Sequence, residues 1–382
     1  MSTETHLDRL RYTLHIDEAN ALIESQIEKL VALVQAELAK VPTSVFVTVI
    51  LSICLPPLIA LFFYEQHNSK TQAEKPKGCK KLGMKIESNL ANEFDANFSR
   101  GRPASTTETS AEWWRVKSMW IYPVKSCKGV ELNHASIITT GMEYDRQFTF
   151  AELKKPAEVT APPGTTQLSP QHKWGFITQR EFPKLATIKT EMWIPDFNSA
   201  SYRPHDDDVE AGGVIIMSFP YQESGIRGKI AALGAKLFGK VPEKQFRIPF
   251  NPTPAQIEKA GYKQEHISIW KDTVTALNME LEIPDELRYY LGISNKLGLF
   301  RIDNSNLREV YRNAPKADDI GYQPVTGFQD AYPLHLINLC SVRDVERQMP
   351  KDKKTPRLSA QRFRANIISK FLCIQSSHIA HF

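Results

Sequence analysis

This sequence lacks paired cysteines, internal repeats and a long basic face. It has five scattered cysteines: Cys54, Cys79, Cys127, Cys340 and Cys373. Their odd number and the absence of a Cys-x-x-Cys pair argue against a disulfide framework and a structural zinc site, and suit a reducing compartment. The net charge of +5 is small, and no basic stretch is interleaved with aromatics. Nothing therefore points to nucleic acid as a partner.

Charge is also absent from residues 43–63, which contain thirteen Val, Ile, Leu or Phe residues. These residues favour membrane insertion by about −4 to −8 kcal/mol. As a helix the segment would measure about 31 Å, enough to cross a hydrocarbon core, and the Pro56-Pro57 kink is tolerated in lipid. A buried core helix is the alternative. A cleaved signal peptide fits poorly because forty-two residues precede the apolar run.

The charges beside this predicted transmembrane helix indicate its orientation. Only Lys40 lies close on the N-terminal side, whereas the C-terminal side carries a lysine cluster: Lys70, Lys75, Lys77, Lys80, Lys81 and Lys85. Because the positive side normally stays in the cytosol, we expect a single-pass membrane protein with a cytosolic C-terminal domain. The lysines are either a solvated linker or in contact with anionic lipid headgroups. The anchor fits the mitochondrial outer membrane and the endoplasmic reticulum equally.

Polar segments flank the helix on both sides. Residues 1–42 form an N-terminal segment in which Asp17 to Lys40 has the apolar spacing of an amphipathic helix. Residues 64–112 are polar and read as a linker, most clearly from Gly101 to Ser110.

The remainder predicts many short strands and few helices, an α+β and mainly β fold. The expected strands are residues 116–122, 135–139, 147–151, 176–178, 214–218 and 299–302, with a hairpin pairing 266–270 and 274–277. Helices are expected at 284–291, after Pro284 and before Gly292, and at 341–348, with Ser341 as N-cap. Residues 155–171 are expected to form a loop. The acidic run at 203–210 is more typical of a solvated loop than of a metal site.

One block carries the chemistry of an oxyanion site. Tyr122-Pro-Val-Lys-Ser-Cys-Lys-Gly129 is followed by Tyr144-Asp-Arg146. Lysine supplies a compact charge, serine a short hydrogen bond, and arginine a planar fork that can hold two oxygens. Each charge-assisted bond contributes about 1.5–3 kcal/mol, so three or four would hold a phosphate. From spacing alone, a surface hairpin with solvated lysines is equally compatible.

The same block resembles the N-terminal β-barrel of the MOSC family, named after the C-terminal domain of molybdenum cofactor sulfurase. Phe176 to Pro183 resembles the family's Thr-x-Arg strand end, and Gln361 to Ile368 resembles its Arg-Phe-Arg-x-Asn block. The resemblance implies an N-terminal MOSC barrel over 113–265 and a MOSC domain over 266–382. It also implies a molybdenum cofactor, a pterin dithiolene with a terminal phosphate.

Matched by position, the resemblance assigns the phosphate or pterin contacts to Lys125, Ser126 and Arg146. Arg364 would contribute from the second barrel, with Asn366 beside it as structural support, and Thr178 and Arg180 are weaker candidates. No catalytic residue is assigned. The apparent relatives are the amidoxime-reducing components, which reduce small N-hydroxylated substrates with electrons from cytochrome b5 and its reductase.

Two departures from the family pattern limit this transfer. Asp330-Ala331-Tyr332-Pro333 replaces a segment in which the family carries two hydroxyls. The family's molybdenum-ligating cysteine lies tens of residues beyond the Arg-Phe-Arg block, whereas Cys373 is too close to it. We therefore expect an incomplete second barrel, a truncated MOSC domain, and no metal ligand.

Two functions remain open. One is a membrane-anchored, molybdenum cofactor-dependent oxidoreductase. The other is a catalytically inactive membrane protein whose barrel retains a site for pterin phosphate or pyridoxal phosphate.

Overall fold

The computed structural model describes residues 22–33, 35–36, 42–95, 115–154, 172–312, 314–350, 352 and 355–370. These residues form an α+β structure dominated by β-sheet. The chain divides into two compact units. The first comprises Met1–His67 and Glu223–Val241, and the second comprises Asn68–Gln222 and Pro242–Phe382.

Two helices make up most of the first unit. Helix α2 (Thr43–Thr71) continues eight residues beyond the predicted end at residue 63 and keeps Pro56 and Pro57 inside it. It is the one helix among the described residues that is long and apolar enough to cross a membrane. Helix α4 (Gly225–Leu237) is the second. Residues 22–33 are also helical, in agreement with the predicted amphipathic helix.

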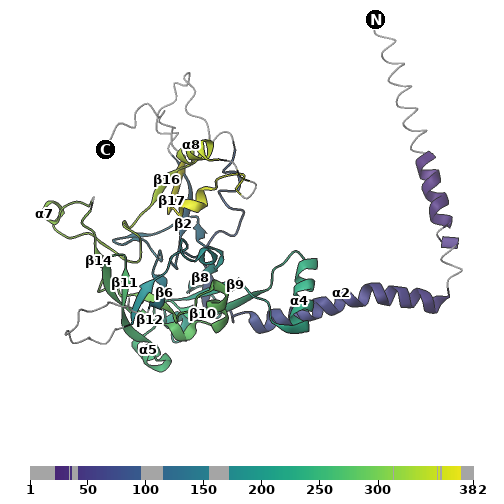
Figure 1. Ribbon diagram of the computed structural model, residues 1–382, viewed down its shortest axis with the longest axis horizontal. Helices are drawn as coiled ribbons and strands as arrows, with labels where there is room; N and C mark the ends of the chain where they lie inside the picture. Colours follow the sequence, from purple (N-terminus) through teal and green to yellow (C-terminus); the bar gives the residue numbers. More distant parts are fainter. Residues whose placement is uncertain are drawn as a thin grey trace, which may run out of the picture. The chain divides into compact units, whose positions relative to one another are not determined.

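A closed barrel forms the centre of the second unit (Figure 1). Its strands, in order around the barrel, are β11 (Lys263–Ile269), β12 (Asp272–Asn278), β13 (Leu297–Ile302), β6 (Phe148–Lys154) and β7 (Lys173–Phe176). All neighbours are antiparallel except β7 and β11, whose parallel pairing closes the barrel. One buried apolar cluster draws on all five strands: Ala151, Trp174, Ile267, Ile269, Val274, Ala276, Phe300 and Ile302, with Phe328.

Two four-stranded sheets complete the unit, with two short pairs. The first sheet is antiparallel and contains β1 (Cys79–Lys81), β8 (Lys189–Pro195), β9 (Val214–Pro220) and β10 (Glu243–Pro249). The other contains β16 (Leu336–Asn338), β17 (Ile367–Lys370), β2 (Arg115–Ile121) and β3 (Val130–Leu132). The short pairs are β4 (Ile137–Ile138) with β5 (Gly141–Met142), and β14 (Arg308–Glu309) with β15 (Val325–Thr326). The sequence thus brings β17, near residue 370, beside β2, near residue 115.

The remaining helices of this unit are short. They are α3 (Asp207–Glu210), α5 (Pro254–Ala260), α6 (Asp285–Leu291), α7 (Ala317–Ile320) and α8 (Leu339–Gln348), with the 3-10 turns η3 (Pro183–Thr187), η4 (Glu280–Glu282) and η5 (Ala360–Phe363). Helix α6 confirms the predicted boundaries, since Pro284 is its N-cap and Gly292 ends it in the left-handed conformation, with φ of 77°.

Strand predictions made from apolar, β-branched runs are confirmed for β2, β6, β9 and β13. The hairpin of β11 and β12 is also confirmed, but its turn is at Trp270-Lys271, one residue earlier than the expected Lys271-Asp272. Three other details differ. Strand β7 ends at Phe176, so 176–178 is mostly turn. The predicted strand 135–139 shrinks to two residues. Helix α8 begins at Leu339, because the side chain of Asn338, not Ser341, accepts from the Cys340 N–H.

The strand pairing does not follow the domain boundary predicted between residues 265 and 266. Strand β11 crosses that boundary, and the barrel shares strands from both sides of it. The second barrel expected over 266–382 therefore does not appear as a separate body among the described residues. The reason is that hydrogen bonding between distant segments, not chain order, sets which strands close a barrel.

Part of the predicted linker is folded onto this unit. Strand β1 pairs with β8, and Glu93 accepts from the Ala360 N–H at 2.7 Å and lies 3.7 Å from the buried Arg343. Through these contacts, part of the polar segment 64–112 pairs with residues of the second unit. The composition of the segment itself did not indicate this pairing. The Gly101–Ser110 stretch, residues 155–171 and Cys373 lie outside the described residues.

The state of one cysteine also differs from the prediction. Cys54, Cys79 and Cys127 are free, whereas Cys340 is disulfide-bonded. The argument from cysteine spacing against disulfides therefore fails at Cys340, since spacing along the chain does not report which sulfurs meet in space.

Gly213 directly precedes β9, at a point where the backbone leaves no room for a side chain. Its φ is +119°, and a Cβ would lie 2.1 Å from the Trp193 carbonyl oxygen; Gly212 has φ of +65° and open space around it. We expect Gly213→Ala to reduce the free energy of unfolding by about 3 kcal/mol or more, and Gly212→Ala by only about 1–2 kcal/mol. Urea denaturation of both variants measures this; equal losses would contradict the steric explanation.

Candidate functional site

The Tyr122–Gly129 block leaves strand β2 and immediately enters the protein interior. Lys125 donates its backbone N–H to the Phe148 carbonyl at 2.8 Å, and Phe148 donates back to Pro123 at 3.0 Å. Ser126 is buried and left-handed, with φ of 68°. The turn is therefore clamped to β6, and the solvated hairpin that spacing also allowed is excluded for Lys125 and Ser126.

The Lys125 ammonium lies in this interior with both of its hydrogen-bond partners close. It donates to the Asp330 carboxylate at 2.6 Å and to the Phe328 carbonyl at 2.7 Å. Burial lowers the pKa of Lys125 to about 8, and Asp330 opposes that fall. The Asp330 carboxylate therefore neutralises the lysine that was expected to bind phosphate.

Arg146 connects the first block to the C-terminal one. Its guanidinium donates to the fully buried Asp145 carboxylate at 2.5 Å and to the Arg364 carbonyl at 2.9 Å, and lies 3.4 Å from the Asn366 amide oxygen. Asp145 in turn accepts from the Tyr122 N–H at 2.8 Å. Arg146 thus joins residues more than two hundred positions apart.

The Arg364 guanidinium has a buried nitrogen without a hydrogen-bond partner. Arg364 follows η5 in the left-handed conformation, with φ of 53°, and its Cζ lies 4.2 Å from the centroid of the Tyr122 ring. Its Nη2 is buried and unpartnered, as is the Tyr122 hydroxyl. Burial lowers the pKa of Arg364, and raises that of Tyr122 to about 12. Both groups are therefore available as hydrogen-bond donors at neutral pH.

Asn366 uses its side chain to hold the sheet. Its amide donates to the Trp120 carbonyl at 3.1 Å, and its oxygen accepts from the His335 N–H at 3.1 Å. These bonds tie the segment before β17 to β2 and to the His335 backbone.

Thr178 and Arg180 lie in the turn that follows β7. The Thr178 hydroxyl accepts from the Arg180 N–H at 3.3 Å, which stabilises the turn. Arg180 is exposed, lies 6.0 Å from the Trp270 ring centroid, and its charge contributes to the lowered pKa of Asp330. The charges of Arg180 and Lys125 therefore both act on the Asp330 carboxylate.

A cavity of about 660 Å³ opens beside Arg364. Its lining comprises Trp120, Tyr122, Lys128, Gly129, Gln179, Pro183, Ala186, Thr187, Lys189, Gln361, Arg362 and Arg364. It carries four cationic side chains and no carboxylate, although Lys189 itself contacts Glu243 at 2.5 Å. Such a lining suits an anionic ligand with an aromatic or heterocyclic body.

The site residues predicted from the sequence therefore do not all lie at this cavity. Only Arg364 lines the cavity; Lys125, Ser126, Arg146, Thr178, Arg180 and Asn366 do not. The cavity beside Arg364 is also lined by residues that were not predicted from the sequence: Tyr122, Gln179, Lys189 and Arg362. Arg362 could have been found, because it stands two positions before Arg364 in the quoted block, whereas Lys189 carries no local signal.

The residues present fit one end of the implied cofactor. The unpartnered Arg364 Nη2 and Tyr122 hydroxyl suit a phosphate. For the metal end, no group of three or more His, Cys, Asp or Glu side chains could hold a metal ion within the described ranges. Cys127 is completely buried, and burial raises its pKa to about 12, so its thiol stays protonated and is a poor metal ligand.

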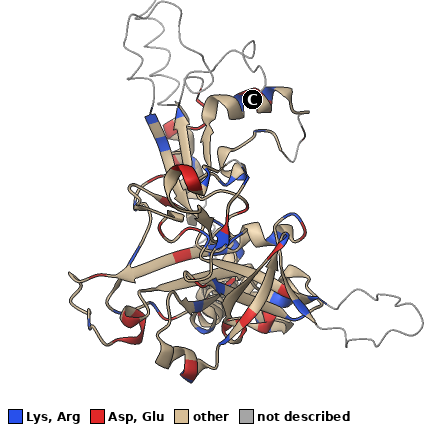
Figure 2. Cartoon of the chain, turned by 90° about the vertical axis from the view of Figure 1, so that its left-hand side faces the viewer, with Lys and Arg blue, Asp and Glu red and all other residues tan. Residues whose placement is uncertain are grey.

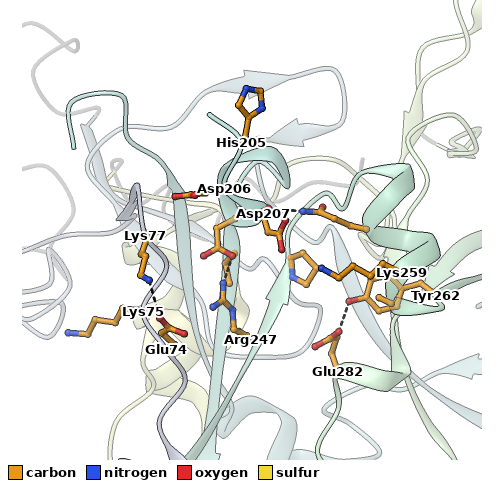
Figure 3. A pocket seen from close by; sticks show the side chains of 15 residues that line it. Glu74, Lys75, Lys77, His205, Asp206, Asp207, Arg247, Lys259, Tyr262 and Glu282 are labelled. Atoms are coloured by element: carbon orange, nitrogen blue, oxygen red, sulfur yellow. Dashed lines mark hydrogen bonds and ion pairs between the residues drawn. The ribbon is translucent and has the colours of Figure 1, made fainter. Parts of the chain in front are cut away.

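A second cavity, of about 720 Å³, has a mixed lining in which opposite charges pair (Figure 3). Asp208 binds Arg247, and Tyr262 donates to Glu282 at 2.5 Å. His205 points away from the other labelled side chains and is 93% exposed. Asp206, Asp207 and Asp208 thus line a charged surface depression, but Asp207–Glu210 forms helix α3 instead of the loop expected over 203–210, and Asp208 is paired with Arg247.

Both charge signs are also interspersed over the cartoon in Figure 2. The grouping of Lys and Arg side chains without Asp or Glu is therefore a local property of the cavity beside Arg364.

The Lys125–Asp330 pair is asymmetric, because Lys125 is buried while the Asp330 side chain is 63% exposed. Asp330→Ala leaves a buried ammonium and should cost about 2 kcal/mol, whereas Lys125→Met replaces it with an apolar chain and should change stability by less than about 1 kcal/mol. The double variant should match Lys125→Met in urea denaturation. A loss in Lys125→Met as large as that in Asp330→Ala would contradict this assignment.

The same burial predicts a pH dependence. Because the folded pKa of Lys125 is about 8 and the unfolded value about 10.5, the unfolded state binds more protons between these pH values. The contribution of Lys125 to the free energy of unfolding should therefore rise with pH across this window, by about 3 kcal/mol in total. Below pH 8 it should be constant. The difference between the wild type and Lys125→Met, measured by urea denaturation from pH 7 to 10.5, reports it; a falling difference would contradict it.

Comparison with known proteins agrees with this part of the fold. Residues 113–207 match the family model of the MOSC N-terminal beta barrel domain. No curated protein sequence matches the chain. The matched residues include β2, the Tyr122–Gly129 block, Arg146 and β6 to β8. Residues 113–207 are therefore similar to the MOSC N-terminal beta barrel domain, and this similarity supports membership of the MOSC domain family.

Proposed function

We propose that this chain binds the phosphate end of a molybdopterin-type cofactor in the cavity beside Arg364. The observation that carries the proposal is the buried, unpartnered Arg364 Nη2 at the wall of a cavity with four cations and no carboxylate. MOSC domains are generally associated with the molybdenum cofactor, which supplies a redox-active metal when bound.

In this proposal the residues named from the sequence divide into two roles. Arg364 and Tyr122 donate to phosphate oxygens, and Lys128 and Arg362 add positive charge at the cavity wall. Arg146 and Asn366 position Arg364, since they hold its backbone and the adjoining strand. Lys125, Ser126, Thr178 and Arg180 shape the neighbouring turns, with the Lys125 charge offset by Asp330.

The wider function we propose is a membrane-anchored oxidoreductase of the MOSC family that reduces small N-hydroxylated substrates. Helix α2 would span the mitochondrial outer membrane or the endoplasmic reticulum, with the second unit in the cytosol. Cytochrome b5 and its reductase would supply electrons. The length and apolarity of α2, and the lysines that follow it, support the anchor.

A second candidate is a catalytically inactive protein that binds pterin phosphate or pyridoxal phosphate. It is favoured by one observation: among the described residues, no cysteine lines the cavity beside Arg364. Molybdenum analysis of the purified full chain together with a benzamidoxime reduction assay separates the two. Molybdenum with turnover supports the oxidoreductase, and bound phosphate ligand without either supports the second candidate.

Removing the Arg364 charge should weaken ligand binding. We expect Arg364→Gln to lower the affinity for pterin phosphate about 10- to 100-fold, because one charge-assisted bond contributes about 1.5–3 kcal/mol. Lys75→Gln, which removes an exposed charge from the other cavity, is the matched control and should change the affinity less than about twofold. Titration followed by pterin fluorescence measures both. Unchanged binding in Arg364→Gln would refute the site.

A further inference from the structure

Helix α4 has two faces of opposite character. Its small residues Gly228, Ala231, Gly234 and Ala235 are buried. A Cβ on Gly234 would lie 2.3 Å from the Ala60 carbonyl oxygen of α2, so the two helix backbones are in direct contact. Small residues permit this close approach of two helices in or near a membrane.

The opposite face of α4 is apolar and exposed. It presents Ile226, Leu233 and Leu237, and the exposed Phe238 and Val241 follow just beyond the helix end at Leu237; each of the five is more than half exposed. Large apolar side chains gathered on one helix face are typical of a surface that binds another apolar phase. Scattered single residues would need no such explanation, but these five lie within one seventeen-residue stretch, residues 225–241.

The charges of this stretch are of one sign. Residues 225–241 contain Arg227, Lys229, Lys236 and Lys240 and no acidic residue. Lys240 also lies 5.8 Å from the ring centroid of Tyr64 in α2. A helix that combines exposed apolar side chains with only basic charges complements an anionic lipid surface better than it complements an acidic or neutral protein face.

The contact between α4 and α2 lies at a level of α2 that is expected at the surface of a bilayer. Ala60 and Tyr64 lie at the end of the apolar run, which stops at Phe63 and is followed by Glu65 and His67. At about 1.5 Å per residue, Ala60 lies within about 5 Å of the end of that run. Tyrosine is enriched at this level of a bilayer, where its ring is apolar and its hydroxyl reaches water.

We propose that α4 is a second membrane element, an interfacial helix that lies in the anionic headgroup region on the C-terminal side of α2. Ile226, Leu233, Leu237 and Phe238 enter the acyl boundary, and the four basic residues contact lipid phosphates. The inference rests on the proposed membrane span of α2, and is independent of cofactor binding.

The test uses the full chain in vesicles of phosphatidylcholine with phosphatidylserine, some carrying brominated acyl chains. Phe238→Trp places a fluorophore at the exposed C-cap of α4, and Phe197→Trp places one at an exposed position in the second unit as the control. Brominated lipid should quench the added fluorescence of F238W and leave that of F197W unchanged. Equal quenching of the two variants, or none, would overturn the proposal.

The contribution of charge is tested by Lys229→Glu with Lys236→Glu in the F238W background. Each basic residue near an anionic surface contributes a factor of about five, so the double reversal should weaken interfacial binding at least about 25-fold. Quenching should fall in vesicles with phosphatidylserine, whereas the helix content by circular dichroism should be unchanged. Full quenching after charge reversal would overturn the role of anionic lipid.

Alkaline carbonate extraction separates this inference from the membrane anchor. Release of the chain by carbonate would refute the span of α2, and with it the position assigned to α4. A chain that resists extraction but leaves F238W unquenched would refute the interfacial helix alone. If that chain also cross-links as a dimer in nanodiscs, a second copy covers the face instead.

Discussion

The Asp145–Arg146 clamp is the contact on which the candidate site depends. Asp145 is fully buried and accepts from the Tyr122 backbone, while Arg146 binds Asp145 and the Arg364 carbonyl. One carboxylate and one guanidinium therefore set the distance between the end of β2 and the segment before β17. Together with the Asn366–Trp120 bonds and the pairing of β17 with β2, this link places the Arg364 guanidinium beside the Tyr122 ring.

This arrangement concentrates positive charge in a poorly solvated place. The Arg146 and Arg364 guanidiniums lie 5.0 and 4.2 Å from the same Tyr122 ring centroid, and each lowers the stability of the other's charge. Contact with the electron-rich ring offsets some of this cost. A bound anion would offset more, which is the physical reason for placing a ligand phosphate here rather than in the charge-paired cavity of Figure 3.

The local elements were largely predictable from sequence. Helix α6 has Pro284 and Gly292 at its ends, and the β11–β12 hairpin follows from apolar, β-branched runs on either side of a short polar turn. These features depend on neighbouring residues, whose backbone preferences are local. By contrast, the start of α8 was predicted wrongly, because Ser341 and Asn338 are both competent caps and packing selects between them.

The candidate site was only partly predictable, for a related reason. The family resemblance assigned Lys125 and Arg364 to one phosphate site, with Arg364 contributing from the second barrel. The structure gives them different partners: Asp330, two hundred residues away along the chain, neutralises Lys125, whereas the Arg364 Nη2 has none. Which cation keeps a free donor depends on the carboxylate that the fold brings to it.

By itself, the sequence determined the apolar length of α2, the basic and apolar composition of α4, and the residue types of the Tyr122–Gly129 and Gln361–Ile368 blocks. Only the tertiary structure decided that the two blocks meet through Arg146, that β6 and β7 close a barrel with β11 to β13, and that Arg364 lines the cavity. Chemical type and local periodicity are properties of short segments. Strand closure and charge pairing are long-range, because their energies depend on residues that only folding brings together.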